Sequence, residues 1–415
     1  MNASQILSTL EIPAAAEVLA PRWEDSAARC PATRPRFLDP KNIRRTRAFA
    51  RLPAAIDPPL YEAAHRIASS PELLQLAWHC HCLLYEYLDF AVQTGIRQWP
   101  HPIPALGDLS GAFYLLIALD AIPRMCAVHQ QLGVPRTISQ AACTHYSEWL
   151  RIYREQHNGR CGVLPHVLYW LRNYTRGDLF RLGRFEYMIK PFTGALRAYR
   201  HRQTRAVVAL AADGTRFDAT GFIAPAAQAA NWTARQWETE NCAMGSPISP
   251  RGYAEQRQVS LPLHEWERAL VPGDAILEVH IPTGGNMSPE HSHASMQQAL
   301  EFFPRYLAAQ RFVGFACSSW ILNPQLEQIY RPDSNMIRWQ RELHLFPVPS
   351  GPRAGLYFVF GKDEIDSAAA PRDTSLRRAL LDHLATGGSL INGGMFLLLE
   401  DFAHFGTQVY RRPRN

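Results

Sequence analysis

The sequence has 415 residues and a net charge of +6 at pH 7; 47% of its residues are hydrophobic and 19% are charged. This length and composition predict two globular domains and exclude a largely disordered or repetitive chain. Basic residues are scattered rather than gathered with aromatic residues into a stripe, so the charge does not indicate a nucleic-acid partner.

The N-terminal segment lacks the composition of a secretion signal, because acidic residues interrupt its apolar stretches and no basic segment precedes them. The most apolar run, residues 111–123, contains Asp120 and is too short to cross a bilayer. The eight cysteines are dispersed without CxxC spacing, so we expect reduced thiols. These features predict a cytoplasmic protein without a membrane span.

Helical periodicity dominates the first part of the chain, and we predict an all-α domain over residues 1–180. Thr137 and Gln140 match a capping box at the start of one helix, and Asn158-Gly159 is a typical helix end. The predicted helices cover about 71–94, 109–130, 137–158 and 163–171.

The period changes near Phe185, and residues 181–415 are predicted to form an α/β domain. Ala212-Asp213-Gly214 lies between two short runs of β-formers and is typical of a hairpin turn, whereas residues 225–258 have no clear period and read as a long connection. The predicted strands cover about 185–190, 197–202, 205–211, 215–223, 275–282, 312–319 and 356–360, and the predicted helices cover about 288–307 and 374–385.

The strand predicted over 275–282 contains the best acid-base candidates. Alternation places Leu277, Val279 and Ile281 on one face, and Glu278 with His280 on the other. Two ionisable groups two residues apart in an apolar strand suit proton transfer. The alternative is that they are the solvated face of an edge strand.

The loop after this strand, Thr283-Gly284-Gly285-Asn286, permits positive φ angles. Ser288 is a good N-cap and Pro289 suits the first helical position, while Pro304 should kink or end the helix near Phe303. Free amides at such a helix start can hold a pyrophosphate. The alternative is an ordinary strand-to-helix connection.

A second group of candidates follows the strand predicted over 312–319. Asn323 and Tyr330 are seven residues apart and are predicted to share one face of a helix, where the tyrosine could donate a proton or simply pack against the core. Cys317 has no Cys-His-Asp pattern around it, so a packed thiol is favoured over a nucleophile.

Two segments contain potential metal ligands: residues 79–82, and His280 together with residues 290–293. Histidines two residues apart on a helix point in different directions, which favours packing over metal binding in both. We therefore predict no metal, and a metal hydrolase or oxygenase built on the second segment is the weaker alternative.

Several segments together resemble a known family: acyltransferase domain-containing bacterial proteins with a helical N-acyltransferase N-terminal domain and a GNAT-like C-terminal domain. The resemblance covers most of the chain. Its segments are residues 111–123, 132–135, 147–162, 176–188, 273–295, 317–326 and 334–346. It implies a two-domain α+β protein in which an all-α domain precedes a GNAT-like α/β domain with a mixed β-sheet.

The resemblance also implies roles for individual residues. In GNAT enzymes the strand before the phosphate loop splays from its neighbour and acyl-coenzyme A lies in the gap. Here Glu278 or His280 would take a proton from an amine, and Tyr330 would protonate the departing thiolate. The implied cofactor contacts are Val279, Ile281, Pro282, Thr283, Gly284, Gly285, Asn286, Ser288, His291 and Asn323.

The implied reaction is transfer of an acyl group from acyl-coenzyme A to an amine of a small molecule or peptide, without a metal. The Gln/Arg-x-x-Gly-x-Gly/Ala loop of the family is absent, and TGGNMSPEHSHAS stands in its place. This difference motivates the alternative of a catalytically inactive GNAT-like protein that binds acyl-coenzyme A or a partner. No oligomeric state is predicted.

Overall fold

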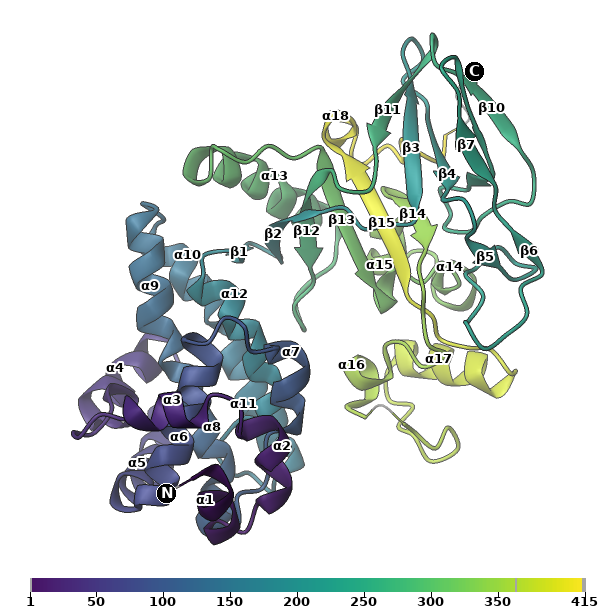
Figure 1. Ribbon diagram of the computed structural model, residues 1–415. Coiled ribbons are helices and arrows are strands. Elements are labelled where there is room, and N and C mark those ends of the chain that lie inside the picture. Colours follow the sequence, from purple (N-terminus) through teal and green to yellow (C-terminus); the bar gives the residue numbers. More distant parts are fainter. Residues whose placement is uncertain (1, 363, 413–415) are drawn as a thin grey trace. The chain divides into compact units, whose positions relative to one another are not determined.

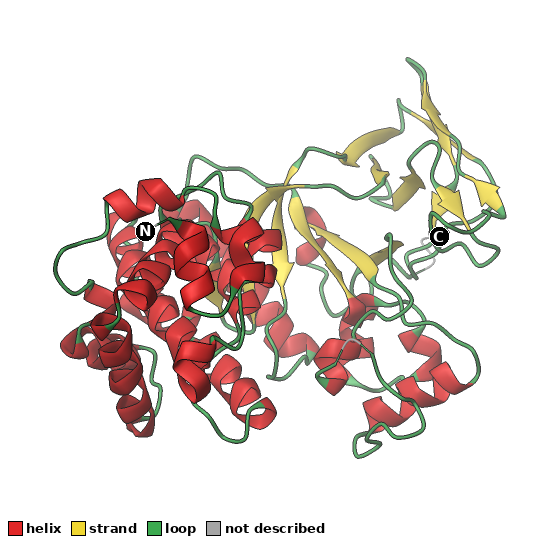
Figure 2. Ribbon diagram, turned by 60° about the horizontal axis from the view of Figure 1, so that its bottom comes forward, coloured by secondary structure: helices red, strands yellow, loops and turns green. Residues whose placement is uncertain are grey.

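A computed structural model describes residues 2–362 and 364–412. The chain divides into two compact units, Met1–Arg181 and Leu182–Asn415. The first contains helices and the second combines strands with helices, as the colouring in Figure 2 makes clear. This is the predicted α+β class, and the sheet of the second unit is mixed as predicted.

The helical unit is built around α8 (Ser110–Leu119), in which every residue is buried. Arg172 of α12 connects that helix to α6: its buried guanidinium donates hydrogen bonds to the carbonyls of Leu83 and Leu84, at the end of α6. The helices of this unit, with 3-10 helices marked η, are α1 (Ala3–Thr9), η1 (Pro13–Ala15), α2 (Ala16–Leu19), α3 (Trp23–Ala28), η2 (Arg36–Leu38), α4 (Pro40–Phe49), η3 (Ala54–Ile56), α5 (Asp57–Ser69), α6 (Pro71–Tyr85), α7 (Val92–Gly95), η4 (Ile96–Gln98), η5 (Pro104–Leu109), α8, α9 (Ala121–Gln131), α10 (Arg136–Ala142), α11 (Thr144–Gln156), η6 (Pro165–Trp170) and α12 (Leu171–Thr175).

One helical stretch, Pro104–Gln131, is long and apolar enough to cross a membrane by length and composition. However, 83% of its most apolar window is buried inside the structure, as in the core helix of a globular protein. Gly107 interrupts the helical geometry near its start, with a φ of 54°.

Some boundaries in this unit were predicted wrongly. The helix expected over 71–94 ends at Tyr85, and the one expected over 137–158 breaks at Cys143 into α10 and α11. The capping box of Thr137 and Gln140 is absent, because α10 already begins at Arg136 after Pro135, with no side-chain cap.

In the second unit, the main sheet has six strands in the order β1-β2-β12-β13-β15-β14. Strands β12 and β13, which lie in the segments predicted as strands over 275–282 and 312–319, are parallel neighbours, while β2–β12, β13–β15 and β14–β15 are antiparallel. Three smaller sheets have the orders β11-β3-β4-β9, β10-β8-β7 and β5-β6. The strands are β1 (Phe180–Leu182), β2 (Phe185–Pro191), β3 (Leu196–His201), β4 (Val207–Ala211), β5 (Arg216–Phe217), β6 (Trp232–Thr233), β7 (Gln236–Glu238), β8 (Cys242–Gly245), β9 (Pro247–Ile248), β10 (Val259–Pro262), β11 (Trp266–Leu270), β12 (Ala275–His280), β13 (Gly314–Ser319), β14 (His344–Pro347) and β15 (Gly393–Leu398).

In Figure 1, α13 and α15 lie along the main sheet, α18 lies at the upper end of β15, and α16 and α17 lie beyond the lower end of the sheet. Helices α13 and α15 pack on one face of the sheet, where Tyr187 hydrogen-bonds Ser295 of α13 and Phe185 contacts the ring of Trp339 of α15. The helices are α13 (Pro289–Tyr306), η7 (Trp320–Leu322), α14 (Leu326–Ile329), α15 (Asn335–Arg341), α16 (Leu356–Phe360), α17 (Ser375–Ala385) and α18 (Leu399–Phe402).

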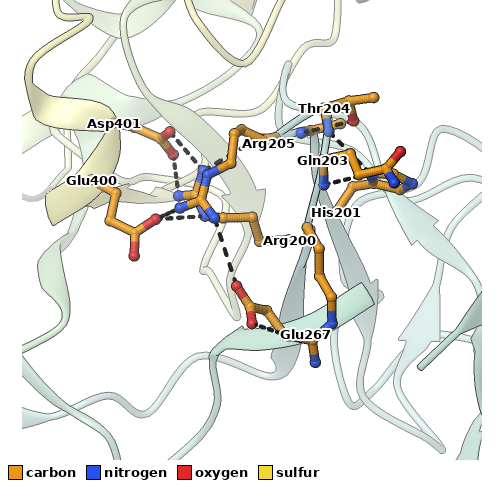
Figure 3. A network of polar contacts seen from close by, with 10 residues as sticks. Arg200, His201, Gln203, Thr204, Arg205, Glu267, Glu400 and Asp401 are labelled. Carbon is orange, nitrogen blue, oxygen red and sulfur yellow. Dashed lines mark hydrogen bonds and ion pairs between the residues drawn. The ribbon is translucent and has the colours of Figure 1, made fainter. Parts of the chain in front are cut away.

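A buried ion pair joins the four-stranded sheet to the end of the six-stranded sheet (Figure 3). Arg200 of β3 donates to both carboxylate oxygens of Asp401, at 2.9 and 2.8 Å, and both side chains are 3% exposed. More exposed ion pairs surround this one. Glu400 pairs with Arg200 and Arg205, and Glu267 pairs with Arg202 and Arg205. The buried pair thus links β3 to the short helix that follows β15.

Four expectations for this unit were wrong. The segment 356–360 is a helix rather than a strand, bounded by Gly355 and Gly361, which both have positive φ. The turn at 212–214 links strands of different sheets and makes no hairpin, and the expected connection over 225–258 contains β6 to β9. Helix α13 does not end near Phe303: it includes Pro304 and ends three residues after Phe303, at Tyr306.

Candidate functional site

The main sheet opens between β12 and β13. Strand β12 pairs with β2 as far as His280, but with β13 only at Leu277–Phe315 and Glu278–Ala316. Strand β13 continues on its other side along β15 to Ser319. Beyond Glu278, therefore, the two parallel strands no longer pair in the described part of the chain, and their C-terminal ends diverge.

Glu278 and His280 lie at this opening and contact each other. His280 Nε2 is 3.0 Å from Glu278 Oε2, and their side chains are 24% and 39% exposed. The hydrogen bond from His280 lowers the pKa of Glu278, with a smaller contribution from the charge of Lys190, while burial acts in the opposite direction. Glu278 is therefore an ionised carboxylate that holds the imidazole.

The other predicted residues of this strand divide between core and surface. Val279 is 1% exposed, whereas Ile281 and Pro282 lie beyond the last strand residue and are half-buried. Cys317 is buried one residue past the last β12–β13 pair, and burial raises the pKa of its thiol further from neutrality. This environment favours the protonated, packed thiol that the sequence predicted.

The loop after β12 has the predicted backbone. Gly284 and Gly285 have φ angles of +74° and +79°, and both are exposed. Asn286 Oδ1 accepts hydrogen bonds from the Ser288 amide and from Asn335 of α15, both at 2.9 Å. The loop is thus closed at its base while Gly284 remains open to solvent.

The start of α13 is also as predicted, with Ser288 as N-cap and Pro289 in the first position. Ser288 Oγ accepts a hydrogen bond from the His291 amide at 3.3 Å and lies 2.9 Å from His291 Nδ1. Thr283 and His291 are exposed beside these amides. An 18-residue helix therefore directs its positive N-terminal end toward the loop.

Sequence reasoning missed Arg184, which lies against this loop. Its Nη1 donates to the carbonyl of Pro282 at 2.9 Å, and a Cβ on Gly285 would lie 3.4 Å from its Cδ and Nε. The hydrogen bond spans 98 residues of sequence, so no local pattern could have found it. Arg184 brings a positive charge to a loop that contains none.

Asn323 and Tyr330 do not share a helix face, which corrects that prediction. Asn323 ends η7, is 1% exposed and accepts the Gln325 amide, and Tyr330 follows the four-residue α14 with extended backbone. Tyr330 OH lies 3.2 Å from Ser375 Oγ of α17. No hydrogen bond from Tyr330 reaches Glu278 or His280 within the residues that the structure describes.

The proposed metal ligands of the weaker alternative have separate partners. His280 is beside Glu278, His291 is beside Ser288, and the His293 ring stacks on Phe402 with 4.7 Å between centroids. In residues 2–362 and 364–412, no group of three or more His, Cys, Asp or Glu side chains could hold a metal ion.

Comparison with known proteins agrees with this geometry. Residues 179–396 match the model of the GNAT-like C-terminal domain, and residues 42–177 match the model of the N-acyltransferase N-terminal domain. A search of curated proteins found no match.

Solved structures share the fold of the chain. They include an acyltransferase with decanoyl-CoA and teicoplanin (TM-score 0.62, 19% identity) and an acyltransferase mutant with octanoyl-CoA (TM-score 0.62, 18% identity). A third is an acyltransferase with CoA and 10C-teicoplanin (TM-score 0.61, 19% identity). Each alignment covers 96% of this chain and 100% of the other.

Proposed function

Because this chain belongs to the family of the GNAT-like C-terminal domain, we propose that it transfers an acyl group from acyl-coenzyme A to an amine. The observation that carries the proposal is the opening between β12 and β13, with Glu278 and His280 at its edge. The pantetheine would enter this opening beside Val279, Ile281 and Pro282.

We assign the proton transfer to the Glu278–His280 pair. The ionised Glu278 carboxylate lies 3.0 Å from Nε2 of His280, so a proton taken from the amine would be held by a carboxylate and an imidazole together. Only a neutral amine attacks a carbonyl, and removing its proton is what a nearby base contributes. The new bond joins the amine nitrogen to the acyl carbon, and the carbon–sulfur bond breaks.

The leaving thiolate needs a proton, and Tyr330 is the proposed donor. Its hydroxyl lies beside Ser375, and its ring packs against a small core of α14, α16 and α17 residues. We propose that Asn323 contacts the cofactor, and that Thr283, Gly284, Gly285, Asn286, Ser288 and His291 surround its pyrophosphate. The positive end of α13 supports that last assignment.

The acceptor class is proposed from chemistry and from the related structures. An amine of a small molecule or peptide fits a base that removes one proton. Solved acyltransferases of this fold have been crystallised with a glycopeptide, teicoplanin, so glycopeptides are the first acceptors to try. The eight unpaired cysteines support a cytoplasmic location, which cell fractionation tests.

The test is calorimetric titration of the full chain with coenzyme A and with acyl-coenzyme A thioesters of increasing length. Binding in the micromolar range is expected, and its absence would overturn the proposal. Mass spectrometry of amines and glycopeptides incubated with the protein and the bound thioester then detects transfer.

A non-catalytic binding protein is the second candidate, because the family's phosphate-loop pattern is absent from residues 283–295. The two candidates differ in turnover. Thioester binding without acyl transfer to any amine in the panel, and without release of free coenzyme A, would favour the binding protein.

A further inference from the structure

Arg184 lies where the loop after β12 needs a cation. It follows Gly183 in the turn between β1 and β2, and it donates to Pro282 O at the loop's entry. A pyrophosphate carries two negative charges, and the end of a helix supplies only about half a positive charge. A guanidinium presents five N–H donors, so one arginine can bind a carbonyl and a phosphate together.

The turn that presents Arg184 is fixed by one buried hydroxyl. Ser295 of α13 is 1% exposed, and its Oγ donates to Leu182 O at 2.5 Å. The same oxygen accepts from the Phe185 amide at 3.0 Å and lies 2.8 Å from Tyr187 OH. Ser295 thus holds the residues on both sides of Gly183-Arg184 against the helix whose first turn faces the loop.

Arg338 is the other arginine near the loop, and it is less suited to this role. It belongs to α15, is 48% exposed, and its guanidinium lies 3.4 Å from the carboxylate of Glu290. An exposed charge opposed by a carboxylate contributes little to anion binding. Arg184 instead lies against the loop itself, where its Nη1 donates to Pro282 O at 2.9 Å beside the glycine that admits close approach.

We propose that Arg184 binds the pyrophosphate of coenzyme A and that Ser295, with Tyr187, is the positioning residue that aims it. This inference rests on the proposed use of acyl-coenzyme A. It replaces the loop arginine or glutamine of the family pattern by an arginine from a different strand connection. Ser295 acts only through the β1–β2 turn and touches no substrate.

The experiment compares the dissociation constants of coenzyme A and of pantetheine, which lacks the pyrophosphate. Arg184→Ala should weaken coenzyme A binding tenfold or more, as expected for a charge-assisted contact, and leave pantetheine binding unchanged. Arg184→Lys should recover part of the loss, because it keeps the charge but not the two-pronged geometry.

Ser295→Ala and Tyr187→Phe test the positioning role. Each should weaken coenzyme A binding by roughly threefold to tenfold, with pantetheine again unchanged. Ser292→Ala is the matched control: Ser292 is fully buried in the same helix, and its hydroxyl has no hydrogen-bond partner in the described structure. It should change neither constant, and Arg257→Ala controls for loss of an exposed arginine elsewhere.

The outcomes separate this inference from the proposed function. If the unmodified protein binds no coenzyme A, the proposed function is wrong. If it binds coenzyme A and the folded Arg184→Ala variant binds it equally well, Arg184 is not the contact. If Arg184→Ala weakens coenzyme A binding and Ser295→Ala does not, the positioning role of Ser295 is wrong. If a variant weakens the binding of pantetheine as much as that of coenzyme A, its effect is a general loss of structure and the assignment to the pyrophosphate is wrong.

Discussion

At the scale of single residues, the site depends on a carboxylate and an imidazole 3.0 Å apart on one face of β12. Each limits what the other can do. The imidazole beside the carboxylate keeps it ionised to lower pH than usual by depressing its pKa. In the proposed reaction, the proton would therefore move through a pair of groups rather than a single base.

Replacing either member should slow transfer without weakening cofactor binding. We expect Glu278→Gln and His280→Gln each to lower kcat by about a hundredfold or more, the usual contribution of a positioned base. The dissociation constant for coenzyme A should change less than twofold in a calorimetric titration. Glu301→Gln, on the exposed side of α13, is the control and should retain full activity. Full activity in both site variants would remove the pair from the mechanism.

The glycine loop offers a second test with an internal control. Gly284 has a φ of +74° and Gly273, before β12, has a φ of +95°, and a Cβ on either would meet nothing within 4 Å. A valine at either position therefore causes similar backbone strain, of about 1–3 kcal/mol. We expect Gly284→Val to weaken coenzyme A binding about tenfold or more and Gly273→Val to leave it unchanged. Equal affinities in the two folded variants would make residues 283–288 an ordinary connection.

Residues of the site were predictable where their evidence is local. The alternation that exposes Glu278 with His280, the positive φ of two adjacent glycines and the N-cap Ser288 all follow from neighbouring sequence. Arg184 was not predictable, because the contact that places it at the loop joins two segments far apart in the chain. Tyr330 was misplaced because a helix was extended through residues that form only one turn.

At the scale of elements, the end of α6 depends on a residue from α12. The last carbonyls of a helix have no partner within it. Arg172, 7% exposed, donates to the carbonyls of Leu83, Leu84, Tyr87 and Phe90 at 2.7 to 3.1 Å. One guanidinium thus closes both the helix and the turn that follows it.

Removing this guanidinium should destabilise the helical unit selectively. Arg172→Met keeps most of the apolar volume but removes the guanidinium that donates to the carbonyls of Leu83 and Leu84, so we expect a loss of about 2–4 kcal/mol in the free energy of unfolding. Urea denaturation measures it, and faster amide exchange should appear in α6. Arg176→Ala, whose half-exposed ion pair with Asp178 is 3.2 Å long, should change stability by less than about 0.5 kcal/mol.

Elements were predicted well where the pattern is long and poorly where it is short. The 18 residues of α13 and the 11 of α17 were found, together with the strands that flank the site. The five residues of α16 are all apolar or aromatic, like a short buried strand, but Leu356 packs in one core cluster with Leu326 and Ile337 and the segment is a helix. Strands of two to four residues, such as β6 to β9, contain too few residues to establish a period.

At the scale of the whole molecule, stability should depend on pH through buried histidines. His79 and His129 in the helical unit and His344 in the second unit are at most 1% exposed, and burial lowers the pKa of each to about 4. The folded protein holds them neutral, whereas the unfolded chain takes up protons below about pH 6.5. The contribution of these neutral histidines to the free energy of unfolding is therefore fully present above about pH 6.5 and is lost as the pH falls toward 4.

Each such histidine should contribute a slope of about 1.4 kcal/mol per pH unit within that window. Urea denaturation at pH 7, 6 and 5 measures the slope, before most carboxylates begin to titrate. In His129→Gln, the slope of the free energy of unfolding against pH should be smaller than in the unmodified protein by the contribution of one histidine. This holds whatever the stability of the variant at pH 7. His264→Gln, at a side chain that is 78% exposed, should leave the slope unchanged, and an unchanged slope in His129→Gln would contradict the assignment.

The position of Lys190 has a consequence for the proposed use of reactive thioesters. Only three lysines occur in the sequence, at positions 41, 190 and 362, and the remaining cations are arginines, which do not lose their charge and so are poor nucleophiles. Lys190 pairs in register with Ile276, and its charge is felt by Glu278. Among the lysines that the structure describes, Lys190 is the one whose charge acts on Glu278, so in the proposed reaction self-acylation would concentrate there and would mark, in a peptide map, the proposed position of the activated acyl group.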